Sequence, residues 1–213
     1  MKMKTIVITG ASSGLGKAIY DGYKGLNGDY GEFYNVIGIS RRGPDIKCDL
    51  RIEIPNIKED IDILINCAGI LNIPESPDEI GNIFNINFVA PYQLIEKNLK
   101  ANMLIVNIAS ISGMGPDPET PIYGASKAAL LSLTASLAKK YAHRNIRENS
   151  ISPGFYHTPL VPGEVPQEIL DAVPLGANKG QFNDIFEIVR MMEQLEYMTG
   201  TNIVIDGGQL CKI

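Results

Sequence analysis

The stretch that decides the fold is Lys4-Thr5-Ile6-Val7-Ile8-Thr9-Gly10-Ala11-Ser12-Ser13-Gly14-Leu15-Gly16. Its β-branched apolar residues predict a buried β-strand over 5–9, and the pattern over 15–26 predicts a helix directly after it. Glycines between a strand and a helix let the backbone turn sharply and bring the helix N-terminus against a pyrophosphate. The stretch therefore indicates a dinucleotide-binding loop, although a plain turn between strand and helix would show the same glycines.

Short apolar runs alternate with helical patterns along the rest of the chain. We expect further strands over 35–40, 61–66, 103–109, 146–152 and 202–206, and further helices over 83–100, 122–142 and 184–195. The runs lack polar alternation, which is typical of parallel strands covered by helices on both faces. The pattern predicts an α/β fold, a Rossmann-like doubly wound parallel sheet, in one domain spanning residues 1–213.

Composition narrows the class of protein. The 213 residues are 45% hydrophobic and 20% charged, which fits a globular domain and excludes disorder, collagen and coiled coil. The net charge of −5 removes the electrostatic reason to expect a nucleic acid or an anionic membrane as partner. Only a short apolar run precedes Gly10, so we expect neither a signal peptide nor a membrane span.

The number and spacing of the cysteines and histidines argue against disulfide bonds and metal sites. Cys48, Cys67 and Cys211 are scattered and odd in number, so we expect buried free thiols in a reducing, cytoplasmic compartment. His143 and His157 lie far apart in the sequence, and no C-x-x-C pair exists to complete a tetrahedral metal site. We therefore predict no metal centre.

Several motifs in order resemble one known family. They are Gly10, Gly14 and Gly16 at the spacing Thr-Gly-x-x-x-Gly-x-Gly, Asn66-Cys67-Ala68-Gly69, Asn87, Tyr123-Gly124-Ala125-Ser126-Lys127, Ser152-Pro153-Gly154 and Asp206-Gly207-Gly208. Together they resemble the short-chain dehydrogenases/reductases over nearly the whole chain. The resemblance implies about seven strands in the order 3-2-1-4-5-6-7 and a nicotinamide dinucleotide cofactor. It also implies a homodimer or homotetramer formed through the helices over 83–100 and 122–142.

The resemblance also implies where a cofactor would be held. The expected contacts are Gly10, Ser12, Ser13, Gly14, Leu15, Gly16, Ser40, Arg41, Arg42, Asp49, Leu50, Asn66, Ala68, Gly69, Tyr123, Lys127, Pro153, Gly154 and Thr158. In the family, the residue matching Asp49 contacts the adenine amino group, which a carboxylate can accept. Simple capping is the alternative for this residue.

The end of the second predicted strand bears on which cofactor is used. An NAD site expects an acidic residue there to bind the ribose 2′-hydroxyl, but this chain has Ser40 followed by Arg41 and Arg42. Two guanidinium groups would bind a 2′-phosphate through charge-assisted hydrogen bonds. Solvated loop charges are the simpler account of the two arginines. We favour NADP(H) over NAD(H).

A tyrosine and a lysine provide the candidate acid–base pair. Tyr123 and Lys127 are four residues apart, so both project from one face of the predicted helix. A nearby ammonium favours phenolate, so we expect it to lower the pKa of Tyr123 from about 10. An exposed amphipathic pair would have the same spacing.

The resemblance adds two further catalytic positions. Ser110, 13 residues before Tyr123, matches the family serine that bonds the substrate oxygen, with Ser112 as the competing candidate. Asn87 matches the asparagine that orders a water near the lysine, whereas Asn85 is interpreted as structural. The implied reaction is hydride transfer between a nicotinamide and a carbonyl or alcohol carbon, with Tyr123 exchanging the proton.

One connection between strands departs from the family pattern. Only 11 residues separate Asp49 from Ile61, fewer than a helical crossover needs, so that helix should shrink to a turn. The sheet face there should be thinly covered or covered by loop side chains.

The expected substrate loop covers about residues 155–180. Between 158 and 178 it contains Glu164, Glu168 and Asp171 but no lysine or arginine, which favours a neutral ketone, aldehyde or secondary alcohol. Phe155 and Tyr156 are the expected apolar substrate contacts, with loop core as the alternative. The competing functions are a 3-oxoacyl-thioester reductase and a non-catalytic protein that senses NADP(H).

Overall fold

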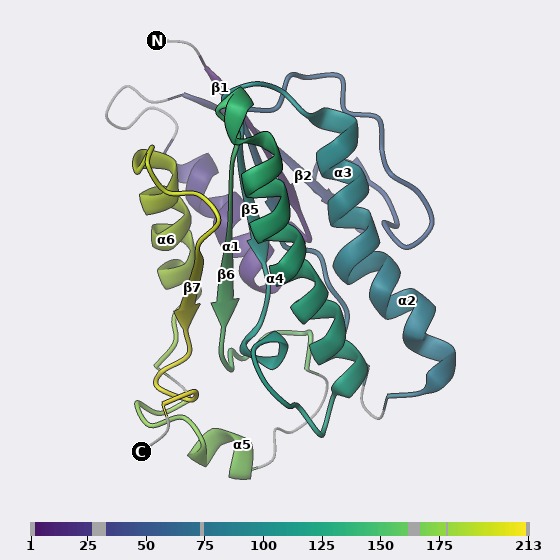
Figure 1. Cartoon of the computed structure of the whole chain (residues 1–213), viewed down its shortest axis with the longest axis vertical. Helices are drawn as coiled ribbons and strands as arrows, with labels where there is room; N and C mark the ends of the chain where they lie inside the picture. Colours follow the sequence, from purple (N-terminus) through teal and green to yellow (C-terminus); the bar gives the residue numbers. More distant parts are fainter. Residues whose placement is uncertain (1–2, 27–32, 73–74, 162–166, 178, 212–213) are drawn as a thin grey trace.

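The protein is built around one parallel sheet (Figure 1). The computed structural model describes residues 3–26, 33–72, 75–161, 167–177 and 179–211. The seven strands lie in the order β3-β2-β1-β4-β5-β6-β7, and each neighbouring pair is parallel. They are β1 (Lys4–Thr9), β2 (Tyr34–Ser40), β3 (Ile46–Lys47), β4 (Ile63–Asn66), β5 (Leu104–Ile108), β6 (Arg147–Pro153) and β7 (Asn202–Ile205). The predicted fold class and strand order are confirmed.

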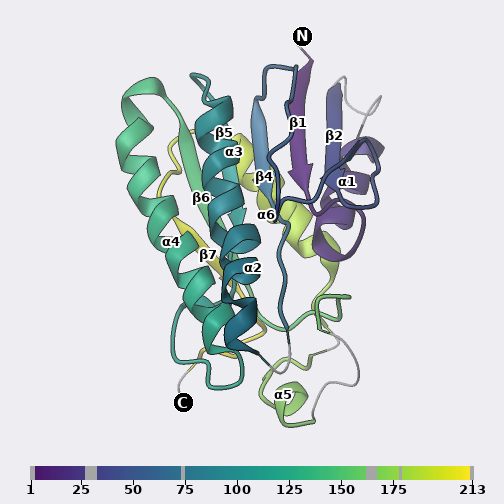
Figure 2. The ribbon, with the colours of Figure 1, turned by 90° about the vertical axis from the view of Figure 1, so that its right-hand side faces the viewer.

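Helices cover both faces of the sheet, which makes three layers (Figure 2). One face carries α1 (Gly14–Gly25) and α6 (Phe182–Gln194), and the other carries α2 (Ile80–Phe84), α3 (Ala90–Asn98) and α4 (Pro121–Tyr141). The shorter elements are η1 (Pro77–Glu79), the π-helical η2 (Asn85–Val89), η3 (Ile111–Gly113), η4 (Ala142–Arg144) and α5 (Gln167–Asp171).

The helix predicted over 83–100 is divided into three consecutive segments. A π-helical turn, η2, separates α2 from α3, and Pro91 follows it in the first turn of α3. Proline has no N–H to donate to the preceding turn, so the regular bonding pattern of an α-helix cannot continue through this position. The turn contains Asn87, whose contacts are described below.

The sheet separates two apolar cores. Ile6 and Ile8 of β1 pack with the α1 and α6 side, whereas Val7 between them packs with the α3 and α4 side. Because both faces are buried, β1 appears in the sequence as an unbroken apolar run rather than an alternating one.

The connection from β3 to β4 has no helix, as its length predicts. Residues 50–60 form a turn followed by irregular chain, and their side chains cover this part of the sheet. Leu50 and Ile57 are buried in the core on that face and Ile54 packs against it, whereas Ile52 is 82% exposed. Loop side chains therefore replace the missing helix.

The predicted burial of the three cysteines is wrong for one of them. Cys48 is buried and Cys67 is half-buried against the core, but Cys211 is exposed because it lies in the surface turn after β7. Among the described residues, no helix is both long and apolar enough to cross a membrane.

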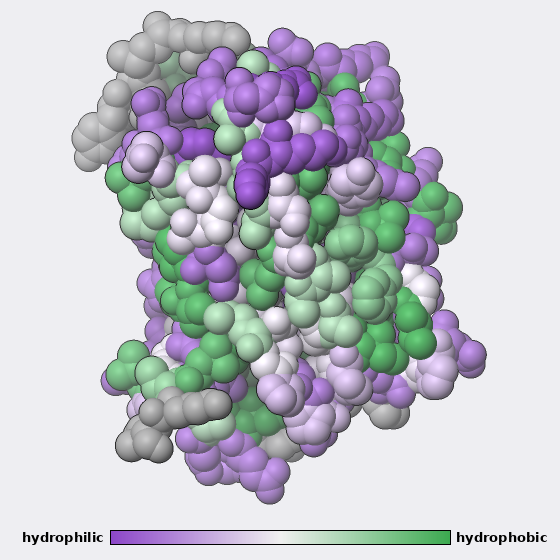
Figure 3. Space-filling view, in the orientation of Figure 1, coloured by the Kyte–Doolittle hydropathy of each residue, from purple (hydrophilic) through white to green (hydrophobic). Residues whose placement is uncertain are grey.

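The middle of the exposed side of α4 is composed of small residues. Ala125, Ala128, Ser132 and Ala135 face outward, and Figure 3 shows pale and green side chains across the middle of this face, with hydrophilic ones along its upper edge. Small side chains leave the helix backbone close to the surface.

Candidate active site

The glycine loop opens α1 at the carboxyl end of β1. Gly10 and Gly14 adopt positive φ angles of 72° and 54°, a conformation that favours glycine. A Cβ atom on Gly16 would lie 2.4 Å from the carbonyl oxygen of Gly10, so the loop and helix pack without side chains between them. Thr158 is brought to the same place, since a Cβ on Gly14 would lie 3.4 Å from the Cβ of Thr158. This cradle fits the predicted pyrophosphate site.

The end of β2 lies beside this loop. The amide of Gly10 donates to the carbonyl of Ile39 at 2.8 Å, which places Ser40, Arg41 and Arg42 next to the glycine loop. Both arginines are exposed, and the Ser40 hydroxyl bonds the carbonyl of Gly43. A cofactor on the glycine loop would therefore have two guanidinium groups near its adenosine ribose.

Asp49 has a partner that sequence reasoning missed. The Arg51 side chain donates to Asp49 Oδ1 at 2.9 Å and to Oδ2 at 2.6 Å. The hydrogen bonds from Arg51 lower the pKa of Asp49 to about 2, so this carboxylate is ionised at neutral pH. The side chain of Leu50 is buried in the core, which leaves only its backbone for the predicted cofactor contact.

The Asn66 side chain points into the sheet, and a cofactor contact by this residue stays a prediction. Asn66 is 2% exposed, and its Nδ2 donates to Asn107 Oδ1 at 2.8 Å inside the sheet. The half-buried Ala68 and Gly69 come after it at the carboxyl edge. Thr9 holds this turn, because its hydroxyl oxygen accepts the amides of Cys67 and Ala68 at 3.0 and 2.9 Å.

The two residues after Ser152 differ in position. Pro153 is the buried last residue of β6, and Gly154 follows it at the edge of the sheet. A Cβ on Gly154 would lie 2.7 Å from Asp206, so only glycine fits against the turn after β7. Gly154 therefore serves chain packing, and a cofactor contact by its backbone stays a prediction.

Ser110, Tyr123 and Lys127 are brought together just beyond β5. Ser110 lies near enough to the Tyr123 phenol to lower its pKa, and the Lys127 Nζ lies 5.7 Å from the centre of the Tyr123 ring. Lys127 donates to the carbonyl of Ile108 at 2.8 Å. All three side chains are buried, with residue exposures of 9%, 7% and 4%. The geometry favours Ser110 over Ser112 as the partner of Tyr123.

Burial dominates the electrostatics of this group. We expected Lys127 to lower the pKa of Tyr123, but burial raises the pKa of Tyr123 to about 12, with the hydrogen bond to Ser110 opposing that rise. Burial also lowers the pKa of Lys127 to about 8. The expectation was wrong for these side chains because transfer from water disfavours the charged form of each.

Asn87 is fully buried and its side chain has three partners. Its Oδ1 accepts the amide of Ile70 at 2.9 Å, and its Nδ2 donates to the Ile70 carbonyl and to the hydroxyl of Ser126 at 3.0 Å each. Asn87 Oδ1 and Lys127 Nζ also border Gly69, at 3.1 and 3.6 Å from a Cβ built there. Asn87 therefore lies beside the lysine while its amide fixes the chain after β4.

The two predicted substrate contacts separate. Phe155 is half-buried, and its ring lies 4.9 Å from that of the exposed His157. Tyr156 is 7% exposed and packs in the apolar core, with its ring 6.3 Å from that of Phe182, which favours the loop-core alternative for this residue. The predicted Glu164 lies outside the described residues. Within the described ranges, no three His, Cys, Asp or Glu side chains are grouped as a metal site.

Sequence reasoning also missed Glu75. Its carboxylate accepts the backbone amides of Ile122 and Tyr123 at 2.7 Å each, across a separation of 47 and 48 residues. An isolated acidic residue in a loop carries no periodicity or spacing that would have identified it. Thr9 shares this character, because its partners, the amides of Cys67 and Ala68, are also far away in the sequence.

Comparison with known proteins finds matches over most of the sequence. The profile of the family described as Enoyl-(Acyl carrier protein) reductase matches residues 53–209. An uncharacterized short-chain type dehydrogenase/reductase of Sinorhizobium fredii is 31% identical over 96% of this chain, which spans 43% of that protein. Carbonyl reductase family member 4 of Xenopus tropicalis is 35% identical over 73% of this chain and 70% of its own. The 3-oxoacyl-[acyl-carrier-protein] reductase of Thermotoga maritima is 30% identical over 96% and 97%.

A solved structure is similar over its full length. 4-Hydroxyisoleucine dehydrogenase complexed with NADH is 30% identical, covers 99% of this chain and 100% of its own, and superposes with a TM-score of 0.83. The similarity therefore includes the glycine loop, the β5 edge and α4 together.

Proposed function

Because the chain belongs to the short-chain dehydrogenase/reductase family, we propose that it interconverts a neutral ketone or aldehyde and the corresponding alcohol with NADP(H). The observation that carries this proposal is the buried group of Ser110, Tyr123 and Lys127 beside the glycine loop. A bound nicotinamide dinucleotide would supply or accept the hydride. The side chains would hold the substrate and move its proton.

Each member of the group has a distinct task in this proposal. The Ser110 hydroxyl would hold the substrate oxygen against the nearby phenol of Tyr123. Tyr123 gives its proton to that oxygen during reduction and takes it back during oxidation. Lys127, whose Nζ lies over the Tyr123 ring, would bind the ribose hydroxyls of the cofactor.

The preference for NADP(H) rests on the end of β2. Ser40 leaves no carboxylate to repel a 2′-phosphate, and the exposed Arg41 and Arg42 supply positive charge beside the glycine loop. The similar 4-hydroxyisoleucine dehydrogenase was solved with NADH, and the proposed preference of this chain differs from that cofactor.

The proposed substrate is uncharged because the chain from 158 to 178 carries acidic but no basic residues. The similar carbonyl reductase from Xenopus tropicalis carries the name of such an activity. A 3-oxoacyl-thioester reductase is the second candidate, favoured by the 30% identity to the Thermotoga maritima enzyme over nearly the full length of both chains.

The α4 face supports an assembly of identical copies. Its outward residues Ala125, Ala128, Ser132 and Ala135 would let a second surface approach the helix closely. We propose a homodimer or homotetramer that uses this face, and sedimentation at micromolar concentration tests it.

One assay tests the cofactor and the chemistry together. Depletion of NADPH, and of NADH in parallel, is followed over a panel of ketones, aldehydes and acyl thioesters, with Tyr123→Phe as the matched variant. We expect turnover of neutral carbonyls with NADPH that is lost in Tyr123→Phe while cofactor binding persists. Tight binding of NADPH without turnover of any compound would contradict the proposal and support a sensing role.

A further inference from the structure

The backbone amides at the start of α4 donate hydrogen bonds to groups that lie outside the helix. The early amides of a helix have no partner within the helix, and Pro121 removes one of these donors. The Thr120 amide donates to Asp117 at 3.1 Å, and the Gly124 amide donates to the Thr120 carbonyl at 2.8 Å. The amides of Ile122 and Tyr123 remain, and each donates to an oxygen of Glu75 at 2.7 Å.

This contact is stronger than an ordinary cap. Two short hydrogen bonds reach one carboxylate, so both are charge-assisted, and the negative charge lies at the positive end of a 21-residue helix. Thr120, the residue in the N-cap position, makes no cap bond with its own side chain. Glu75, which lies in the loop that follows β4, therefore caps α4 in place of a residue next to the helix.

The contact acts on the backbone of Tyr123 itself. Glu75 holds its amide, and the Ser126 hydroxyl donates to its carbonyl at 2.7 Å. Ser126 in turn accepts a hydrogen bond from Asn87, whose amide also clamps Ile70. The tyrosine backbone is thus held on one side by Glu75 and on the other by the chain through Ser126 to Asn87.

We propose that Glu75 is a positioning residue for the reaction, because it fixes the Tyr123 backbone so that the phenol meets Ser110 above Lys127. The inference rests on the proposed role of Tyr123. An error of about 1 Å in the placement of a reacting group costs on the order of 100-fold in rate. A cap that only stabilised α4 would change unfolding but leave the rate of the folded protein unaltered.

The test compares three substitutions in the full chain. Glu75→Gln keeps one acceptor but presents an amide NH₂ to the second backbone N–H. Glu75→Asp retains both acceptors on a shorter arm and serves as the conservative variant. Glu119→Gln removes an exposed carboxylate from the same helix end and is the matched control for charge alone.

We expect kcat of Glu75→Gln to fall about 10- to 100-fold. The dissociation constant for NADPH should stay within about twofold, since the glycine loop is untouched. Glu75→Asp should recover part of the rate, and Glu119→Gln should behave as the parent. The inference is overturned if kcat of Glu75→Gln equals that of the parent at a temperature where both are folded, or if Glu119→Gln loses as much.

Hydrogen exchange separates failure of this inference from failure of the proposed function. The amides of Ile122 and Tyr123 should exchange faster in Glu75→Gln than in Glu119→Gln, which reports the contact without any substrate. If the parent protein turned over no carbonyl compound, the proposed function would be wrong. An active parent with unchanged kcat in Glu75→Gln would remove only the positioning role.

Discussion

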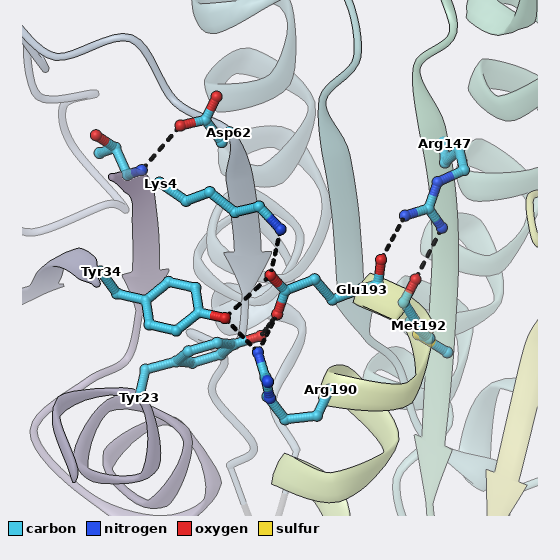
Figure 4. A network of polar contacts seen from close by, with 9 residues as sticks. Lys4, Tyr23, Tyr34, Asp62, Arg147, Arg190, Met192 and Glu193 are labelled. Carbon is cyan, nitrogen blue, oxygen red and sulfur yellow. Dashed lines mark hydrogen bonds and ion pairs between the residues drawn. The ribbon is translucent and has the colours of Figure 1, made fainter. Parts of the chain in front are cut away.

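Two buried polar clusters lie at opposite ends of the sheet and are built in opposite ways. At the amino ends of β1 and β2, the carboxylate of Glu193 is 6% exposed and bonds Lys4, Tyr23, Tyr34 and Arg190 (Figure 4). We call these five residues the Glu193 cluster.

At the carboxyl ends, Ser110, Tyr123 and Lys127 form what we call the Tyr123 cluster. The ammonium of Lys127 bonds a carbonyl oxygen rather than a carboxylate, and burial lowers its pKa to about 8. In the Glu193 cluster, paired charges hold α6 to the sheet. In the Tyr123 cluster, the buried lysine has no carboxylate partner, so keeping it there costs stability. The difference supports the proposal that the reaction takes place at the carboxyl end.

The largest effect that would sharpen this comparison is expected from Lys127→Met. A buried lysine with a lowered pKa opposes folding at neutral pH, so its replacement by an apolar chain of similar length should leave the unfolding midpoint no lower. Turnover should fall about 10²- to 10⁴-fold, the usual range for loss of acid–base function.

Exposed Lys139 on the same helix provides the control substitution Lys139→Met. Steady-state kinetics and thermal unfolding, measured on both variants, decide the point. A strongly destabilised Lys127→Met would break the comparison, because the lysine would then be structural.

The Glu193 cluster should respond in the opposite sense. Glu193→Gln removes the charge that pairs with Arg190 and Lys4, leaving a largely buried guanidinium without its carboxylate. Loss of one partner of a buried pair costs about 3–5 kcal/mol, which denaturant unfolding measures directly. The parent kcat should persist below the transition, and a large fall in kcat of the folded variant would show that the two ends are coupled.

The sequence accounts for the fold because the fold depends on local patterns. The apolar run over 5–9, the glycine spacing after it and the 11 residues between Asp49 and Ile61 each act over a short stretch of chain. They predicted the parallel sheet, the α1 entry and the missing crossover helix, all of which are present.

The candidate site was less accessible to sequence reasoning because it depends on direction and burial. Spacing placed Tyr123 and Lys127 on one helix face, but the depth of burial that raises the pKa of Tyr123 has no sequence signal. Asn66 and Tyr156 were assigned by position after a strand, whereas their side chains point into the protein. Glu75 had no sequence signal because its partners, 47 and 48 residues away, are set by tertiary structure.

Glu148, the second residue of β6, offers a further test. It is fully buried in β6, its Oε1 accepts from Asn107 at 2.7 Å, and burial raises its pKa from 4.5 to about 8. Nearby Glu96 adds to that rise. Between these pH values the folded chain binds more protons than the unfolded chain, so stability should fall as pH rises from about 4.5 to 8.

Glu148→Gln keeps the shape of the side chain and cannot ionise. The loss of stability with pH, on the order of a few kcal/mol in the parent, should flatten in this variant when unfolding is measured across that window. Asp171→Asn, at the end of the short α5, is the control for loss of a carboxylate elsewhere. An identical pH slope in Glu148→Gln and the parent would mean that Glu148 does not govern it.

The smallest effect is expected at the exposed rim of the carboxyl end, where Arg41 and Arg42 follow β2. Water screens these charges, so each contact with a 2′-phosphate is worth about 1 kcal/mol rather than the larger value of a buried pair. The double substitution Arg41→Gln, Arg42→Gln should therefore weaken NADPH binding about 10- to 30-fold while leaving NADH binding within about twofold.

Fluorescence titration of both cofactors at two salt concentrations measures this change in affinity, with exposed Lys47→Gln as the control. The parent preference should shrink with added salt, whereas that of the double variant should not, because only the parent binds the extra phosphate by charge. Equal losses of affinity for NADPH and NADH would place the two arginines outside the 2′-phosphate site. The rim of the carboxyl end would then not determine which cofactor is bound.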